Sequence, residues 1–159
     1  MSESIPVVVV ASEAFGEGKP IPAEYTCDGR DFSPRLTVSG LPPATVTWAV
    51  LMDDPDAPVG DWVHWLAFNL PPALTELAAG ITPEALAGQG GRVGANSWGQ
   101  SRYQGPCPPA GTHRYFFKVF ALDTVLDLPA GTGKAAFLAR AKGHVLAHGM
   151  LMGRYARRR

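Results

Sequence analysis

The chain has 159 residues, a length that fits one domain with a sizeable core. Its 14 basic and 14 acidic residues cancel, which disfavours general nucleic-acid or membrane-surface binding, since both usually need a basic excess. High contents of glycine (18) and proline (15) favour many short strands and turns over long helices. We therefore predict a single domain over residues 1–159 that binds no nucleic acid.

The first strand is expected within residues 5–11, an apolar run without basic residues before it. The run is too short to span a membrane and lacks the charged start of a signal peptide. We therefore expect a cytoplasmic protein with no integral membrane segment. The basic tail, residues 154–159, is interpreted as a solvated C-terminus.

The two cysteines, Cys27 and Cys107, are too few for a disulfide scaffold. A chain of this length also has no need of one to stabilise its core. We therefore expect free thiols, although a bridge between the two cysteines is conceivable.

Three later segments have the patterns of strands. Residues 45–52 are apolar at both odd and even positions, which predicts a central strand covered on both faces. Residues 113–123 form another strand, in which His113 and Tyr115 share a face. Between them, residues 61–70 are predicted to carry one face of Trp62, His64, Leu66 and Phe68 and another of Val63, Trp65 and Ala67.

The C-terminal part holds the best helix candidate, residues 133–149, where Ala, Leu, Arg and Lys dominate. Gly143 is expected to break this helix, and residues 149–156 could form a last strand or a fraying helix. The Gly- and Pro-rich connection 71–112 is long enough to predict a functional loop or small elements of its own. The whole pattern favours a mainly β fold, an antiparallel β-sandwich with one or two C-terminal helices.

A turn after the predicted central strand carries three carboxylates, Asp53, Asp54 and Asp56. Pro55 fixes its own φ and pushes Asp54 toward an extended conformation. Two carboxylates held this close repel, so at least one needs a donor or a proton. A cluster of this kind indicates a site, although an ordinary solvated turn is the alternative.

Histidines on the neighbouring strands could complete such a site. His64 lies on an otherwise apolar face, where a lone histidine is more often a packed core or rim residue. His113 and Tyr115 begin a strand, and strand beginnings at a sheet edge commonly line pockets. Before them, Gly105 opens a proline-rich loop, residues 105–112, in which glycine permits close approach of a ligand.

Four segments in this order resemble the phosphatidylethanolamine-binding protein family, also called the Raf kinase inhibitor-like family, and specifically its bacterial and archaeal branch. They are YTCDGRDFSPRL (25–36), DDPDAPVGDWVHWLAFNLP (53–71), GPCPPAGTHRYFFKVFALD (105–123) and GHVLAHG…GRYAR (143–157). The departures from the usual pattern, Arg35 and Val38, lie away from the pocket motifs.

The resemblance implies a β-sandwich with a small pocket for anions such as phosphate, acetate or a phospholipid headgroup, and it implies a homodimer. It carries ligand-binding roles over to Asp54, Asp56, Trp62, His64, Gly105, His113 and Tyr115.

Two aspartates in an anion pocket need an explanation, because carboxylates repel phosphate. A neighbouring carboxylate raises the pKa of a histidine and orients its ring. We therefore expect the aspartates to act on His64 and His113, which would offer N–H groups to the ligand together with the Tyr115 hydroxyl. Alternatively, Asp54 or Asp56 could hold the ammonium of an ethanolamine-like headgroup.

The leading prediction is a small binding protein without catalysis, cofactor or metal. The main alternative is a hydrolase that uses the Asp/His cluster for acid–base catalysis. A metal site lacks closely spaced ligands in the sequence, and a nucleophilic thiol at Cys107 is less favoured than a buried or loop cysteine. A regulator that binds a protein partner is a third class. Arg114, on the face opposite His113, is expected to pair with an acidic group of the scaffold.

Overall fold

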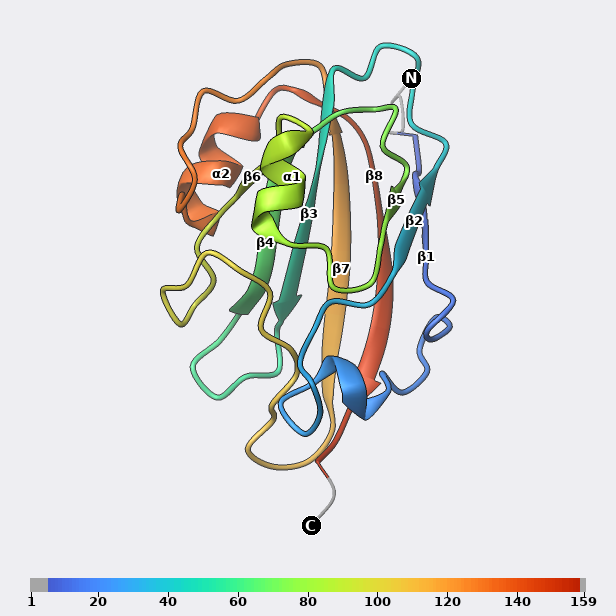
Figure 1. The fold of residues 1–159 in the computed structure, drawn as a ribbon, viewed down its shortest axis with the longest axis vertical. Coiled ribbons are helices and arrows are strands. Elements are labelled where there is room, and N and C mark those ends of the chain that lie inside the picture. Colours follow the sequence, from blue (N-terminus) through green and yellow to red (C-terminus); the bar gives the residue numbers. More distant parts are fainter. Residues whose placement is uncertain (1–5, 158–159) are drawn as a thin grey trace, which may run out of the picture.

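Two antiparallel β-sheets face each other in the computed structural model, which describes residues 6–157 (Figure 1). The larger sheet has the strand order β6-β4-β3-β7-β8, and the smaller sheet has the order β1-β2-β5. The predicted antiparallel β-sandwich is therefore confirmed. The strands are β1 (Val9–Ala11), β2 (Leu36–Ser39), β3 (Thr47–Asp54), β4 (Trp62–Leu70), β5 (Glu76–Leu77), β6 (Arg92–Val93), β7 (His113–Leu122) and β8 (Val145–Tyr155).

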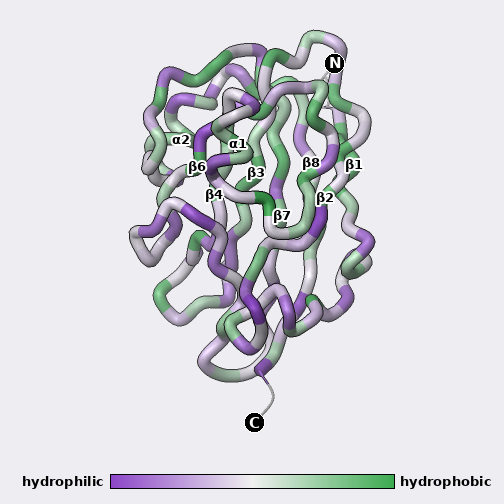
Figure 2. The backbone as a smooth tube through the Cα atoms, in the orientation of Figure 1, coloured by the Kyte–Doolittle hydropathy of each residue, from purple (hydrophilic) through white to green (hydrophobic). Residues whose placement is uncertain are grey.

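The core has two parts, one on each face of the larger sheet. Strand β3 is buried at every position because it lies at the centre of that sheet, as its two-sided apolar pattern predicts. Trp48 and Phe117 belong to the cluster between the two sheets. Leu51 and Phe68 pack with Phe137 on the other face, which helix α2 (Lys134–Ala141) covers. Hydrophobic residues accordingly follow the central strands, and hydrophilic stretches gather mainly in the loops (Figure 2).

Strand β4 pairs irregularly with β3 at two places that its sequence pattern does not reveal, one between Ala67 and Leu70 and one, a bulge, at His64. Met52 pairs with Trp65, but the next residue, Asp53, pairs with Val63, so His64 is the extra residue. The predicted faces are therefore wrong beyond His64, because the bulge reverses the alternation. The cluster under α2 receives Leu66 and Phe68, whereas the cluster between the sheets receives Trp65 and Ala67.

The C-terminal elements are a helix and then a strand. The predicted helix is confirmed as α2 (Lys134–Ala141), and Gly143 follows it with a φ of 84°. Residues beyond Gly143 form β8, which pairs with β7 over its whole length, so the last element is a strand. Neither α2 nor any other helix within residues 6–157 has the length and apolarity needed to cross a membrane.

The long 71–112 connection holds small elements, as its length predicts. One is helix α1 (Pro83–Gly88), whose N-terminus is capped by the Thr82 hydroxyl, which accepts a hydrogen bond from the amide of Ala85. A 3-10 helix, Ala23–Tyr25, begins the earlier loop. The first residue of the predicted 5–11 strand and the last two of the basic tail lie outside the described residues.

Cys27 and Cys107 form a disulfide that closes a separation of 80 residues, so the expectation of free thiols is wrong. Two hydrogen bonds beside it join the same two loops. The Cys27 amide donates to the Pro106 carbonyl at 3.1 Å, and the Gly105 amide donates to the Asp31 carboxylate at 2.7 Å. Pairing of these cysteines depends on this approach of two irregular loops, which cysteine spacing alone does not predict.

Candidate ligand-binding site

A cavity of about 290 Å³ lies at the end of the larger sheet where β3 ends and β7 begins. The loop after β3, residues 55–61, and the segment before β7 gather at this end of the molecule (Figure 1). The structure brings five of the seven predicted site residues to the cavity lining, namely Asp54, Trp62, His64, His113 and Tyr115.

Asp54 orients His113. Its Oδ2 atom accepts a hydrogen bond from His113 Nδ1 at 2.7 Å, and its Oδ1 atom accepts one from the Asp56 amide at 2.8 Å. Both side chains of the pair are buried, with 9% of His113 and 4% of Asp54 exposed. Because an ionised carboxylate only accepts, Nδ1 carries the proton, and Nε2 is the ring nitrogen left for a ligand.

His64 is held differently, by the backbone carbonyl of Gln104, to which its Nδ1 donates at 2.7 Å. Burial lowers the pKa of His64, and the Gln104 hydrogen bond and the charge of Asp54 offset this only in part. The charge of Asp54 therefore raises this pKa as expected, but burial has the larger effect and the net shift of the His64 pKa is downward. At neutral pH the ring is neutral and Nε2 is an acceptor.

Tyr115 contributes a buried hydroxyl at the cavity. Its side chain is fully buried, and the hydroxyl makes no hydrogen bond of ordinary geometry within the described part of the chain, although it lies near enough to Asp54 and the Cys107 backbone to interact with both. Burial raises the pKa of Tyr115, and the negative charge of Asp54 raises it further. The hydroxyl therefore keeps its proton, and a buried donor without an acceptor is destabilising unless a ligand or water completes it.

Asp56, a predicted ligand residue, does not line the cavity. Its carboxylate forms a bidentate ion pair with Arg114, in which Oδ1 lies 2.8 Å from Nη2 and Oδ2 lies 2.9 Å from Nε. Oδ2 also accepts from the Arg114 backbone amide at 2.9 Å. The hydrogen bond from the Arg114 side chain lowers the pKa of Asp56 to about 2, although burial opposes it. Asp56 thus fastens the turn to β7, and Arg114 pairs within the scaffold as expected.

Gly105, the other predicted residue outside the lining, is needed for packing. A Cβ atom at this position would lie 2.1 Å from the carbonyl oxygen of Tyr25 and 2.6 Å from Asp31 Oδ1. Only glycine lets the two disulfide-linked loops come this close. Its contribution to the cavity is therefore indirect, because it positions the segment that continues into Cys107.

The cavity is also lined by residues that the sequence did not predict as site residues. Trp98 makes edge-to-face contacts with Trp62, at a centroid separation of 5.4 Å, and with His64, at 5.0 Å. The turn that presents Trp98 is fixed by Asn96, whose side-chain oxygen accepts from the Trp98 amide at 3.0 Å. Trp98 lies in an irregular segment without periodicity, so strand patterns give no indication of its place. The remaining lining residues are Ala57, Pro58, Val59, Cys107, Pro108 and Pro109.

Two chemical alternatives can be compared with this arrangement. Cys107 is part of the disulfide, so the alternative of a nucleophilic thiol is wrong. Among residues 6–157, no three His, Cys, Asp or Glu side chains are grouped so that they could hold a metal ion.

A family model described as phosphatidylethanolamine-binding protein matches residues 11–156 of the chain. The chain belongs to this family. The resemblance found in its motifs is thereby confirmed, and the match spans both sheets and all the cavity-lining residues.

Relatives occur among archaea and bacteria. A UPF0098 protein of Methanothermobacter thermautotrophicus is 44% identical over 146 residues, which cover 92% of this chain and 97% of the relative. The crystal structure of a candidate phosphatidylethanolamine-binding protein homologue from Chlamydia trachomatis matches with a TM-score of 0.89 at 36% identity, covering 96% of this chain and 99% of that one. YbcL of E. coli, a member of the mammalian family by its description, matches with a TM-score of 0.88 at 29% identity, covering 95% and 99%.

Proposed function

We propose that the cavity binds a small anion of the phosphate type, either free or as the headgroup of a phospholipid. The observation that carries this proposal is the Tyr115 hydroxyl, a fully buried donor that lines the cavity and makes no hydrogen bond of ordinary geometry, although Asp54 lies near it. An anionic oxygen is the strongest acceptor that it could meet, since hydrogen bonds to charged groups are about twice as strong as neutral ones.

The histidines would supply the remaining donors. His113 Nδ1 and His64 Nδ1 are already engaged, so each ring can add a donor at Nε2 only when it takes up a second proton. Anion binding is therefore expected to be linked to proton uptake. The carboxylate of Asp54 would stabilise a charged His113 ring, which explains a negative group beside an anion site.

An ammonium site at the aspartates is less well supported. Both oxygens of Asp54 already accept hydrogen bonds, and both oxygens of Asp56 are bound to Arg114 outside the cavity lining. The apolar rim near the cavity, with Val59 77% exposed and Trp98 40% exposed, fits an anion that carries an apolar neighbour. We therefore propose that the anionic group enters the cavity and that the rim contacts the rest of the ligand.

Calorimetric titration with sulfate from pH 5 to 9 tests the proton linkage. Sulfate keeps its charge over this range, whereas phosphate becomes more negative near neutral pH and would obscure the effect. The lowered pKa of His64 means that its charged form gains population only as pH falls, so sulfate affinity should fall as pH rises. Affinity that stays constant or rises with pH would exclude histidine-led anion binding.

The variant Tyr115→Phe tests the hydroxyl itself. Loss of one hydrogen bond to a charged group predicts sulfate or phosphoethanolamine binding weaker by about tenfold or more. Stability should change little, because the hydroxyl makes no hydrogen bond of ordinary geometry within the described part of the chain. Tyr103→Phe is the matched control, since the Tyr103 hydroxyl donates to the Tyr25 carbonyl at 2.7 Å and does not line the cavity. Equal affinity of wild type and Tyr115→Phe would refute the proposal.

Other expectations stay predictions. The resemblance predicts a homodimer, which sedimentation equilibrium can test. A regulator that binds a protein partner stays the third candidate class, which a comparison of wild type with His113→Ala in pull-downs can test. The cytoplasmic location also stays a prediction. Nothing in the arrangement of Asp54, His64 and His113 favours the hydrolase alternative over binding.

A further inference from the structure

The anion cavity has few groups that can carry a positive charge. No lysine or arginine of the described chain lines it. Arg114, which follows His113 in β7, is bound elsewhere, since its guanidinium donates to both carboxylate oxygens of Asp56. His64 and His113 are therefore the described lining side chains that can become cationic, and each must take up a proton to do so.

The prolines of the cavity wall add no backbone donors. Pro58, Pro108 and Pro109 all line the cavity, and proline has no amide N–H. Sites for doubly charged phosphate groups commonly use arginine forks or rows of backbone amides. Three prolines supply neither, so this part of the wall is poorly suited to a second negative charge.

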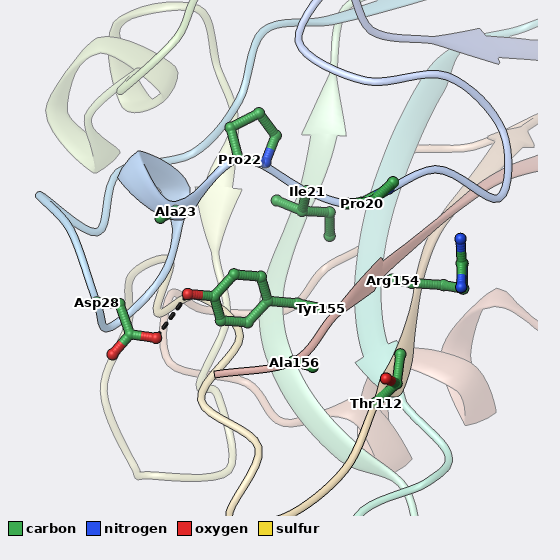
Figure 3. A pocket seen from close by; sticks show the side chains of 9 residues that line it. All are labelled: Pro20, Ile21, Pro22, Ala23, Asp28, Thr112, Arg154, Tyr155 and Ala156. Atoms are coloured by element: carbon green, nitrogen blue, oxygen red, sulfur yellow. Dashed lines mark hydrogen bonds between the residues drawn. The ribbon is translucent and has the colours of Figure 1, made fainter. Parts of the chain in front are cut away.

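A larger hollow at the edge of β8, of about 700 Å³, illustrates a permanent counter-charge (Figure 3). There, the Asp28 carboxylate accepts a hydrogen bond from the Tyr155 hydroxyl and lies 2.9 Å from Nη2 of Arg157, a guanidinium that stays charged at every ordinary pH. In the anion cavity, the ion-pair partner of Asp54 is His113, whose ring is charged only after it takes up a proton. The charge of the anion cavity is therefore variable and small.

The lining of the cavity reaches at most a single net positive charge. Asp54 contributes one negative charge, and the two imidazole rings together contribute no more than two positive charges. One negative charge of a ligand neutralises this state completely. A second negative charge would stay unmatched beside the buried side chains of Asp54, His64 and Tyr115, and an unmatched buried charge is strongly unfavourable.

Charged groups just outside the lining do not add net positive charge. Asp31 is negative and acts on His64, whose pKa is nevertheless lowered by burial. Asp56 is negative and acts on His113, and its ion pair with Arg114 offsets its charge. A doubly charged ligand therefore meets no further positive group among these neighbours.

We infer that the anion cavity selects singly charged anions over doubly charged anions of the same shape. This inference rests on the proposed function and names the class of ligand. A phosphodiester, a sulfate monoester or a carboxylate belongs to the favoured class, whereas the dianion of a phosphate monoester does not. A phosphate monoester should enter as its monoanion, whose P–OH group can donate to the unprotonated Nε2 of His64 or His113.

Methyl sulfate and methyl phosphate test the inference, because the two ions have the same shape and differ in charge. The second pKa of a phosphate monoester is about 6, so methyl phosphate is a dianion at pH 8 and a monoanion at pH 5, whereas methyl sulfate is a monoanion at both. Titrations followed by NMR amide shifts, expected to centre on residues 57–59 and 107–109, give both affinities. Methyl sulfate should bind at least about tenfold more tightly at pH 8, and the two affinities should agree within about threefold at pH 5.

A variant that adds a permanent positive charge should weaken this selectivity. Val59 lines the cavity and is exposed, so a lysine is tolerated there and can reach the ligand. At pH 8 and low ionic strength, Val59→Lys should raise the affinity for methyl phosphate relative to methyl sulfate by about threefold or more. Val59→Met is the matched control, because it has a similar length without the charge and should leave the ratio of affinities unchanged.

The results separate this inference from the proposed function. If methyl phosphate binds at pH 8 as tightly as methyl sulfate, or more tightly, the charge selectivity is refuted while anion binding itself stands. An equal ratio of affinities in Val59→Lys and Val59→Met also refutes it. If neither ion binds at pH 5, the proposed function fails and the inference fails with it.

Discussion

Asp53 and Asp54 are adjacent, equally buried and on opposite faces of strand β3, and they serve different parts of the molecule. Asp53 lies on the face covered by α2, where its Oδ2 accepts from Lys118 at 3.1 Å and from Lys134 at 2.9 Å. Asp54 lies on the face of the cavity and binds His113. The alternation of side chains along a strand thus assigns one carboxylate to the scaffold and the next to the site.

The comparison teaches that burial of a carboxylate does not by itself indicate function. Both aspartates are less than 4% exposed, yet only Asp54 has a histidine partner and lies at a cavity. What distinguishes them is the chemistry of the partner. The Lys134 pair holds α2 against the sheet, whereas the His113 pair fixes the orientation of an imidazole ring that lines the cavity.

The largest effect is expected from removal of the disulfide. This cross-link lies beside the cavity that Asp54 lines and away from the face on which Asp53 pairs with lysines. The double variant Cys27→Ser/Cys107→Ser should lose about 2–4.5 kcal/mol of unfolding free energy, since the bridge closes a loop of 80 residues in the unfolded chain. Urea denaturation measures this loss. Sulfate affinity should also fall, because Cys107, Pro108 and Pro109 line the cavity.

The same cross-link bears on the predicted cytoplasmic location. Disulfides persist mainly in oxidising compartments and are rare in cytosolic proteins outside hyperthermophiles. Thiol titration of the protein as isolated from its native cells separates the two predictions. Two reactive thiols per chain would favour a reducing compartment, and none would favour an oxidising one or an organism in which cytosolic disulfides are common.

An intermediate effect is expected from paired variants of the two aspartates. Asp53→Asn should lose about 2 kcal/mol of unfolding free energy, less than the usual loss for a buried pair. The reason is that Lys118 and Lys134 are 31% and 23% exposed and can turn toward water. Sulfate affinity should be unchanged in Asp53→Asn and reduced about tenfold in Asp54→Asn, which no longer stabilises a charged His113. Loss of sulfate binding in both variants would show that the two faces are not independent.

The smallest effect is expected at the Asp56–Arg114 pair, which joins the turn after β3 to the start of β7. Asp56→Asn should lose about 1 kcal/mol of unfolding free energy at pH 7, because the pair is partly exposed. Arg114 lowers the pKa of Asp56 to about 2, so the folded state favours the ionised carboxylate. This contribution is present above pH 4 and is lost as pH falls toward 2. The stability difference between wild type and Asp56→Asn should therefore shrink over that range, and a constant difference would contradict the ion-pair explanation.

Regular elements of the fold could be predicted from the sequence because their causes are local. The two-sided apolar pattern of residues 45–52 predicts the central strand β3, and the composition around Phe137 predicts α2. The face of His64 was also correct. The faces beyond it were wrong, because a bulge depends on how β4 pairs with β3 and not on the order of residues in β4.

The candidate site could be predicted only where strands carry it. His113 and Tyr115 begin a regular strand and line the cavity as a pair. Trp98 and the disulfide were missed because irregular loops position them through long-range contacts. Asp56 is predicted to bind the ligand, but both of its carboxylate oxygens are bound by Arg114, a long-range contact that the sequence pattern does not reveal.

The extra residue in β4 has a consequence for how this protein can change over evolution. Deleting His64 would restore regular pairing and leave Trp62 on the cavity face, because Val63 would still pair with Asp53 and Trp62 with Asp54. The sheet would stay intact, and the cavity would lose one imidazole ring. A lineage that keeps the fold but lacks this one residue should therefore have lost the part of anion binding that depends on proton uptake by His64.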